Sequence, residues 1–207
     1  MKLDLHVHTN YSGCAITKPF ILNKLIKKTG VQVALTDHNT MKGVDKVKGC
    51  IPGEEISTNI GHVIGLFLNE RIKPFMSVEE TVDKIKEQGG VVFVPHPFDS
   101  IRKNVKHLDF KKDIVEVFNG RVIIQKDNEK ALEYAEKNNV LQGVGSDAHT
   151  PYEVGKNYLE MEDFNSVKEF LLNLKKAKHV IHPHPYYAFV YTHGLSVVKN
   201  RLGLFLK

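Results

Sequence analysis

The chain has 207 residues, of which 42% are hydrophobic and 26% are charged. These proportions are those of an ordinary globular protein, so they exclude a largely disordered chain and a membrane-embedded one. The formal net charge of +5 suits an anionic partner such as a phosphate ester or a nucleic acid, but the lysines are spread through helical stretches and form no basic block.

The sequence favours one soluble domain. It opens on a strand-like pattern without a secretory signal, and no apolar run reaches the roughly 20 residues of a membrane-spanning helix. Two cysteines, Cys14 and Cys50, are too few for a disulfide scaffold. We therefore expect a cytoplasmic protein in which residues 1–207 form one domain. Residues 180–207 are expected to pack on it as a C-terminal extension, the alternative being a helix on a membrane or partner.

Apolar stretches of strand length alternate with stretches of helical spacing. Such alternation is typical of parallel strands joined by helices, so the predicted fold class is α/β. Ser77, with Glu80 three residues later, predicts a helix start with a capping box, and Gly89 predicts its end. The predicted strands are residues 3–8, 31–38, 50–57, 61–68, 90–97, 113–120 and 141–149, and the predicted helices are residues 18–30, 77–90 and 125–139.

The first predicted strand has two different faces. Alternate side chains of a strand point to opposite sides, so its leucines and valine share one face while Asp4, His6 and His8 share the other. Taken alone, a histidine pair on a strand is more often structural or solvent-facing than metal-binding. The polar face is nevertheless one that could hold a metal.

Similar polar residues recur where later strands end. In a barrel of parallel strands these ends converge on one rim, which is where such enzymes build their sites. Imidazole and carboxylate together are the ligand set of zinc, manganese or iron, and a carboxylate can bridge two ions. The residues at these strand ends are His6, His8, Asp37, His38, Glu55, His96, Asp147 and His149.

Six segments together resemble successive motifs of the PHP family, the polymerase and histidinol phosphatase domain. They run in the family's order from residue 3 to about residue 150, and they read DLHVHTNYS, LTDHNTMKG, IPGEEIS, GHVIGLFL, VPHP and GVGSDAHT. The resemblance implies a distorted (β/α)7 TIM-like barrel, with two or three divalent ions at the C-terminal rim of its strands.

The resemblance also implies three groups of metal ligands. They are His6, His8, Glu55 and Asp147 for a first ion, Glu55, His62 and His96 for a second, and His38 with His149 for a third. In GEEIS the family pattern favours Glu55 as the bridging carboxylate over its alternative, Glu54.

Several further residues are candidates for supporting roles. Cys14 stands where family members often have another His or Asp, so it is either a thiolate ligand or a small buried thiol. Asp4 and Asp37 could accept hydrogen bonds from ligand imidazoles, although Asp37 could equally be a cap or turn residue. Asn119 and Arg121 follow a strand and could line the rim. Arg121 would then grip a substrate phosphate, the alternative being a surface arginine.

A second histidine pair, His182 and His184, stands between prolines. Prolines favour an extended loop there, so we do not expect this pair to bind metal.

The function implied is that of a metal-dependent phosphoesterase. A metal-bridging hydroxide would attack the phosphate of a small phosphomonoester, nucleotide or oligonucleotide, with Glu55 and Asp147 at the metals. His149 could protonate the leaving group if no metal holds it. Neither a GxSxG nucleophile motif nor a Walker phosphate loop is present in the sequence. The alternatives are C–N bond hydrolysis, as in amidohydrolases, and a noncatalytic nucleic-acid-binding or assembly module with structural metals.

Overall fold

The computed structural model describes residues 1–102, 104–105 and 108–182. Of the predicted C-terminal extension only residues 180–182 fall within this range, so its packing and the second histidine of the pair at 182 and 184 lie outside the described residues. Within the described part of the chain, every helix is too short or too polar to span a membrane.

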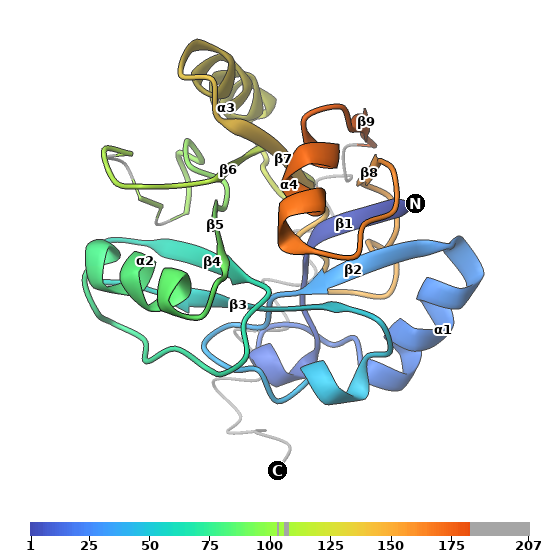
Figure 1. Ribbon diagram of the computed structural model, residues 1–207. Helices are drawn as coiled ribbons and strands as arrows, with labels where there is room; N and C mark the ends of the chain where they lie inside the picture. Colours follow the sequence, from blue (N-terminus) through green and yellow to red (C-terminus); the bar gives the residue numbers. More distant parts are fainter. Residues whose placement is uncertain (103, 106–107, 183–207) are drawn as a thin grey trace.

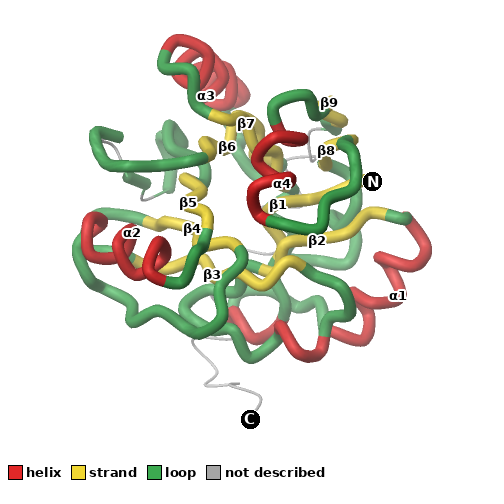
Figure 2. The backbone as a smooth tube through the Cα atoms, in the orientation of Figure 1, coloured by secondary structure: helices red, strands yellow, loops and turns green. Residues whose placement is uncertain are grey.

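One sheet of nine strands organises the molecule, and seven of its strands form a nearly closed ring (Figures 1 and 2). Neighbours run in the order β7-β6-β5-β4-β3-β2-β1, and β8 and β9 extend the sheet beyond β1. The ring closes where Val7 pairs with Ala148, just after β7. The strands are β1 (Lys2–Val7), β2 (Val31–Leu35), β3 (Ile51–Ser57), β4 (His62–Leu66), β5 (Val91–Val94), β6 (Ile114–Asn119), β7 (Leu141–Gly145), β8 (Tyr158–Glu160) and β9 (Lys178–Val180).

The ring confirms the predicted α/β barrel but departs from seven repeated strand-helix units. Strand β4 runs antiparallel to both neighbours, because a hairpin joins it to β3. Between β2 and β3 the only helix is a short 3-10 turn, and the described residues between β5 and β6 contain no helix. The α-helices of the described chain are α1 (Pro19–Thr29), α2 (Val78–Glu87), α3 (Gln125–Lys137) and α4 (Val167–Leu174).

Local signals explain where the helices begin and end. Ser77 caps α2 and accepts from the backbone N–H of Glu80, whose side chain accepts in return from the backbone of Ser77. This is the predicted capping box, and it satisfies two N–H groups that a helix start leaves unpaired. Helix α1 ends at Gly30, whose φ of 70° is the left-handed conformation that glycine adopts without strain.

Helix α4 and strands β8 and β9 were not predicted as such, and α4 closes one end of the barrel. Phe170 and Leu174 of α4 belong to the same buried cluster as Leu3, Val91 and Ile114, which stand at the beginnings of their strands. Helix α4 therefore covers the N-terminal end of the ring. Polar residues gather at the opposite end of the barrel, where the parallel strands end.

Candidate metal centre

The polar residues expected at strand ends do converge on one rim. His6 belongs to β1 and Glu55 to β3, while His38, His96 and the segment from Asp147 to His149 follow β2, β5 and β7. His62 joins them although it begins its strand. Because β4 runs antiparallel, its first residue pairs with Ser57, the last residue of β3, and so lies at the same rim.

The first group of side chains surrounds the Nε2 atoms of His6 and His8, which lie 3.0 Å apart. Each of these atoms is 3.3 Å from the Oε2 atom of Glu55. The Oδ1 atom of Asp147 lies 3.2 Å from the Nε2 atom of His8 and 3.6 Å from that of His6. All four side chains are buried, so donor atoms meet here without water to screen them.

The second group uses the other oxygen of the same carboxylate. The Oε1 atom of Glu55 lies 3.3 Å from the Nδ1 atom of His62 and 3.4 Å from the Nε2 atom of His96. Glu55 thus faces both groups, which is the arrangement expected of a bridging carboxylate. Its alternative, Glu54, points elsewhere, because its side chain accepts from the backbone N–H of Ile72.

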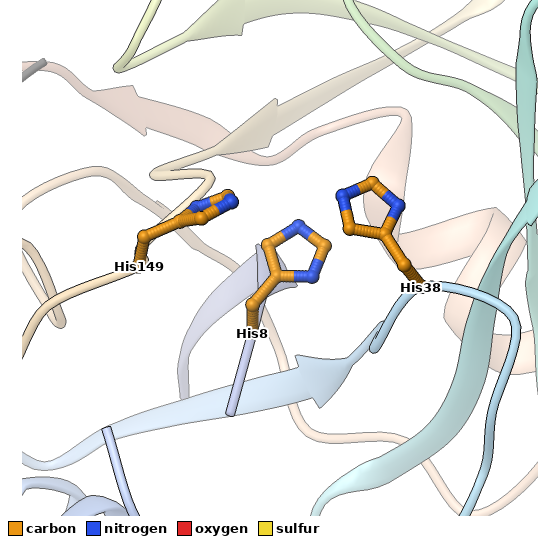
Figure 3. A group of neighbouring side chains, drawn as sticks. All are labelled: His8, His38 and His149. Atoms are coloured by element: carbon orange, nitrogen blue, oxygen red, sulfur yellow. The ribbon is translucent and has the colours of Figure 1, made fainter. Parts of the chain in front are cut away.

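A third group consists of His8, His38 and His149, which come from three separate segments and turn their rings toward one another (Figure 3). The ring centroid of His8 lies 4.7 Å from that of His38 and 4.5 Å from that of His149. The family resemblance implied only His38 and His149 as ligands in this group. The structure adds His8, which is shared with the first group, so the two groups compete for one imidazole.

Hydrogen bonds fix which nitrogen of three imidazoles carries the proton. The Nδ1 atom of His6 lies 3.0 Å from a carboxylate oxygen of Glu116, and that of His149 lies 2.7 Å from the backbone oxygen of Asp147. Both partners only accept, so Nδ1 must donate. The Nδ1 atom of His8 meets the hydroxyl of Ser12, whose own proton goes to Asp37. In each neutral ring the Nε2 atom is therefore left with a lone pair.

The donor set fits divalent cations. Lone pairs of His6 and His8 face each other and two carboxylates at distances that are unfavourable unless a positive charge lies among them. Burial opposes protonation of His6, yet Asp147, Glu116 and Glu55 raise its pKa well above the ordinary value. The cluster thus holds a proton strongly when no metal is bound, and a metal would have to displace it.

The pKa values of His38 and His149 are shifted in the opposite direction to that of His6. Burial lowers the pKa of His38 to about 3. Burial, together with the charge of Arg121, holds the pKa of His149 well below its ordinary value. A neutral His149 whose Nδ1 proton is already donated has no proton to give, so this environment disfavours the leaving-group acid role predicted for it.

Two candidate ligands have strained backbones. His96 has a φ of 30° and Asp147 a φ of 54°, which is the left-handed region that non-glycine residues rarely adopt. Hydrogen bonds hold both: the backbone N–H of His96 donates to Glu116 and that of Asp147 donates to the backbone of His6. Strain of this kind persists only where the surroundings enforce it, and it concentrates at functional sites.

The supporting residues partly differ from the prediction. Asp4 does not reach an imidazole: it accepts from the backbone N–H groups of His6 and Ser146. Asp37 reaches His8 only through Ser12. Cys14 is absent from the ligand groups found among the described residues, and burial raises the pKa of its thiol to about 12. These features favour a buried thiol over a thiolate ligand.

Arg121 is not placed to grip a phosphate. Its side chain is only 6% exposed and forms an ion pair with Glu153, which also accepts from the backbone of His149 and from Thr150. This pair therefore positions the segment that follows β7. Asn119 does lie at the rim, where its amide donates to Asp147 and Glu116.

Two residues of the site were missed from the sequence. Glu116 is fully buried between two valines in strand β6, and a carboxylate within such an apolar run is the signal that could have identified it. Arg102 donates to Asp147, Asp99 and Asn119 from the loop after β5. It sits in an ordinary polar stretch, so only the tertiary structure identifies it.

A family model and a related protein both match this chain. A family model described as PHP-associated matches residues 125–179. The uncharacterized protein MJ0417 of Methanocaldococcus jannaschii is 41% identical in an alignment 194 residues long, which covers 86% of this chain and 80% of that protein.

Solved structures share the fold at low sequence identity. PsfC from Pseudomonas syringae matches with a TM-score of 0.70 and 16% identity, over 95% of this chain and 98% of that one. A protein assigned as a metal-dependent phosphoesterase from Bifidobacterium adolescentis matches with a TM-score of 0.60 and 18% identity, over 83% of this chain and 95% of that one. The lesion-specific endonuclease PfuEndoQ from Pyrococcus furiosus matches with a TM-score of 0.63 and 18% identity, over 86% of this chain and 57% of that one.

These similarities agree with the barrel and with the order of the sequence motifs along it. The chain belongs to the PHP family.

Proposed function

We propose that this protein is a metal-dependent phosphoesterase that hydrolyses a phosphate ester of a small molecule, nucleotide or oligonucleotide. The observation that carries the proposal is the convergence of imidazole and carboxylate donors around Glu55 at one rim of the barrel. Divalent ions bound by such donors supply hydroxide at neutral pH and stabilise the negative charge of a phosphate in the transition state.

The chain's own residues have three tasks in this proposal. The first task is to bind metal: His6, His8 and Asp147 of the first group would hold one ion, His62 and His96 of the second group would hold another, and Glu55 offers one carboxylate oxygen to each. The third group is the weaker site, because His8 has a single free lone pair and the first group also needs it. Zinc, manganese and iron all accept this donor set.

The second task is to keep the imidazoles in the binding tautomer. Glu116 does this for His6, and Asp37 does it for His8 through Ser12.

The third task is to present positive charge to the substrate. Arg102 stands beside Asp147 at the rim, and two of its N–H groups remain beyond the three contacts described above.

The test combines metal analysis with a substrate panel. The purified protein is expected to contain zinc, manganese or iron and to release phosphate from at least one phosphoester when that metal is present. His62→Ala and Asp147→Asn should lower both metal content and turnover by at least tenfold. His179→Ala is the control, because His179 lies in β9, away from the ligand groups.

Three results decide between the proposal and its alternatives. A native protein without bound metal and without metal-dependent turnover contradicts the proposal. Release of ammonia in place of phosphate supports C–N bond hydrolysis. Nucleic-acid binding that survives both substitutions, with no turnover of any phosphoester, supports a noncatalytic module.

A further inference from the structure

A hollow of about 860 Å³ opens beside the candidate metal centre. It lies between the turn at residues 57–62, the side chain of Phe75 and residues of the loop that follows β5. His62, a ligand of the second group, lines it, and so does Arg102, which donates to Asp147. Its volume is within the roughly 300–1,000 Å³ of pockets that hold small ligands. The hollow therefore adjoins the site at which the ester would react.

Three exposed apolar side chains border the hollow among its polar residues. Ile60 is 50% exposed, Phe75 74% and Ile101 54%, and all three border the same hollow. Single exposed apolar residues are ordinary, but a group of them around one concavity marks a place where an apolar ligand or partner binds. The half-buried ring of Phe98 adds a second aromatic surface.

Phe75 is held in an unfavourable backbone conformation. Its φ is 67°, and for a bulky side chain this left-handed value is a true outlier. The backbone N–H of Phe75 donates to the backbone oxygen of Ser57 at 2.6 Å, which holds the main chain of Phe75 beside the turn. The ring gains little from burial in return for this strain. Strain without a packing benefit indicates that the position serves a ligand.

The wall of the hollow is set by close backbone packing. A Cβ atom on Gly61 would lie 2.5 Å from the carbonyl carbon of Asn104 and 2.6 Å from the backbone nitrogen of Val105, so only glycine lets the turn and the loop approach this closely. Asn104 also lines the hollow, and its Oδ1 atom is buried with no hydrogen-bond partner among the described residues. Asn59 adds another amide to the lining.

We infer that this hollow is the subsite for the leaving group of the ester, and that it accepts a heteroaromatic ring stacked on Phe75. This inference rests on the proposed function. A flat ring with polar edge atoms matches an exposed aromatic face bordered by aliphatic side chains and amides, whereas a plain alkyl group would leave the amides unmatched. Phosphate esters with such a ring have the chemistry of nucleotides.

The subsite is tested by binding as well as by turnover. The binding probes are the nonhydrolysable methylenephosphonate analogue of adenosine monophosphate and propylphosphonate, titrated calorimetrically into the metal-loaded protein. Phe75→Ala should weaken binding of the ring-bearing phosphonate by about tenfold or more, because stacking of a base on an aromatic side chain is worth that much. Binding of propylphosphonate should stay the same.

Two further variants separate stacking from other effects. Phe75→Tyr keeps an aromatic face and should bind the ring-bearing phosphonate like the wild type. Phe20→Ala removes another exposed phenylalanine, on α1 and outside the hollow, and should change neither affinity. Circular dichroism should show unchanged folding for all three variants, because both phenylalanines are largely exposed.

The outcomes distinguish failure of the subsite from failure of the phosphoesterase. If Phe75→Ala binds the ring-bearing phosphonate as tightly as the wild type, or if the wild type does not prefer it over propylphosphonate, the subsite is rejected even where esters are hydrolysed. If ring-selective binding depends on Phe75 but no ester is hydrolysed with any metal, the hollow stands as a ring-binding site, while its assignment to a leaving group and the phosphoesterase are both rejected.

Discussion

The role of Glu116 gives the sharpest prediction, and Glu116→Gln is the perturbation. One carboxylate oxygen faces the Nδ1 atom of His6 at 3.0 Å, and the other accepts from the backbone of His96 at 2.7 Å and from Asn119 at 2.9 Å. All three partners donate. Glutamine has only one oxygen, so its NH₂ group must face at least one of these donors.

The least costly orientation turns the NH₂ group of the new glutamine toward His6. The opposite orientation would break two hydrogen bonds, whereas this one requires only that the imidazole of His6 move its proton from Nδ1 to Nε2. The Nε2 atom then loses the lone pair that faces His8 and Glu55. Changes to partners of metal-binding histidines typically weaken metal affinity by about 10- to 100-fold, which is about 1.4–2.7 kcal/mol.

Two measurements check this prediction. Competition with a chelator gives the zinc or manganese affinity, and nitrogen NMR of the zinc-loaded protein reports which nitrogen of His6 carries the proton. Glu133→Gln is the matched control, because it makes the same change of charge at an exposed position of α3. The reasoning is refuted if Glu116→Gln folds normally, keeps the His6 tautomer and binds metal within about twofold of the wild type.

Four further predictions concern stability, packing, protons and the thiol. Glu153→Gln removes the charge that pairs with buried Arg121, so the free energy of unfolding in urea should fall by about 3 kcal/mol. Gly145→Ala places a Cβ atom against His6, and the resulting overpacking should cost about 1–3 kcal/mol by the same assay and lower metal occupancy in elemental analysis. The pKa of His6 is raised, so a metal must displace its proton, and titrations at several pH values should show affinity rising as pH increases through neutrality. Cys14→Ser should leave the number of bound ions unchanged in elemental analysis, because the raised pKa keeps the thiol protonated. A metal affinity that does not change with pH would contradict the prediction for His6, and loss of a bound ion from Cys14→Ser would contradict the prediction for the thiol.

The sequence alone determined the fold class and the family of this protein. Strand-length apolar runs and the capping box at Ser77 predicted the α/β fold class, because each depends on a period or spacing of only a few residues. The resemblance of the motifs to a known family implied the barrel and the metal ligands at its rim. The order of the motifs also identified the PHP family. The preference for Glu55 over Glu54 came from the family resemblance, and in the structure the two side chains point to opposite sides of β3.

Only the tertiary structure decided how the site's residues are supported. Glu116 is 110 residues from its partner His6, and Arg102 is 45 residues from its partner Asp147, so no local period could pair them. The same holds for Arg121, an ordinary arginine in sequence that becomes a buried ion pair once β6 and β7 bring Glu153 to it. Hydrogen bonds and ion pairs between distant segments depend on three-dimensional position, and the barrel alone supplies that position.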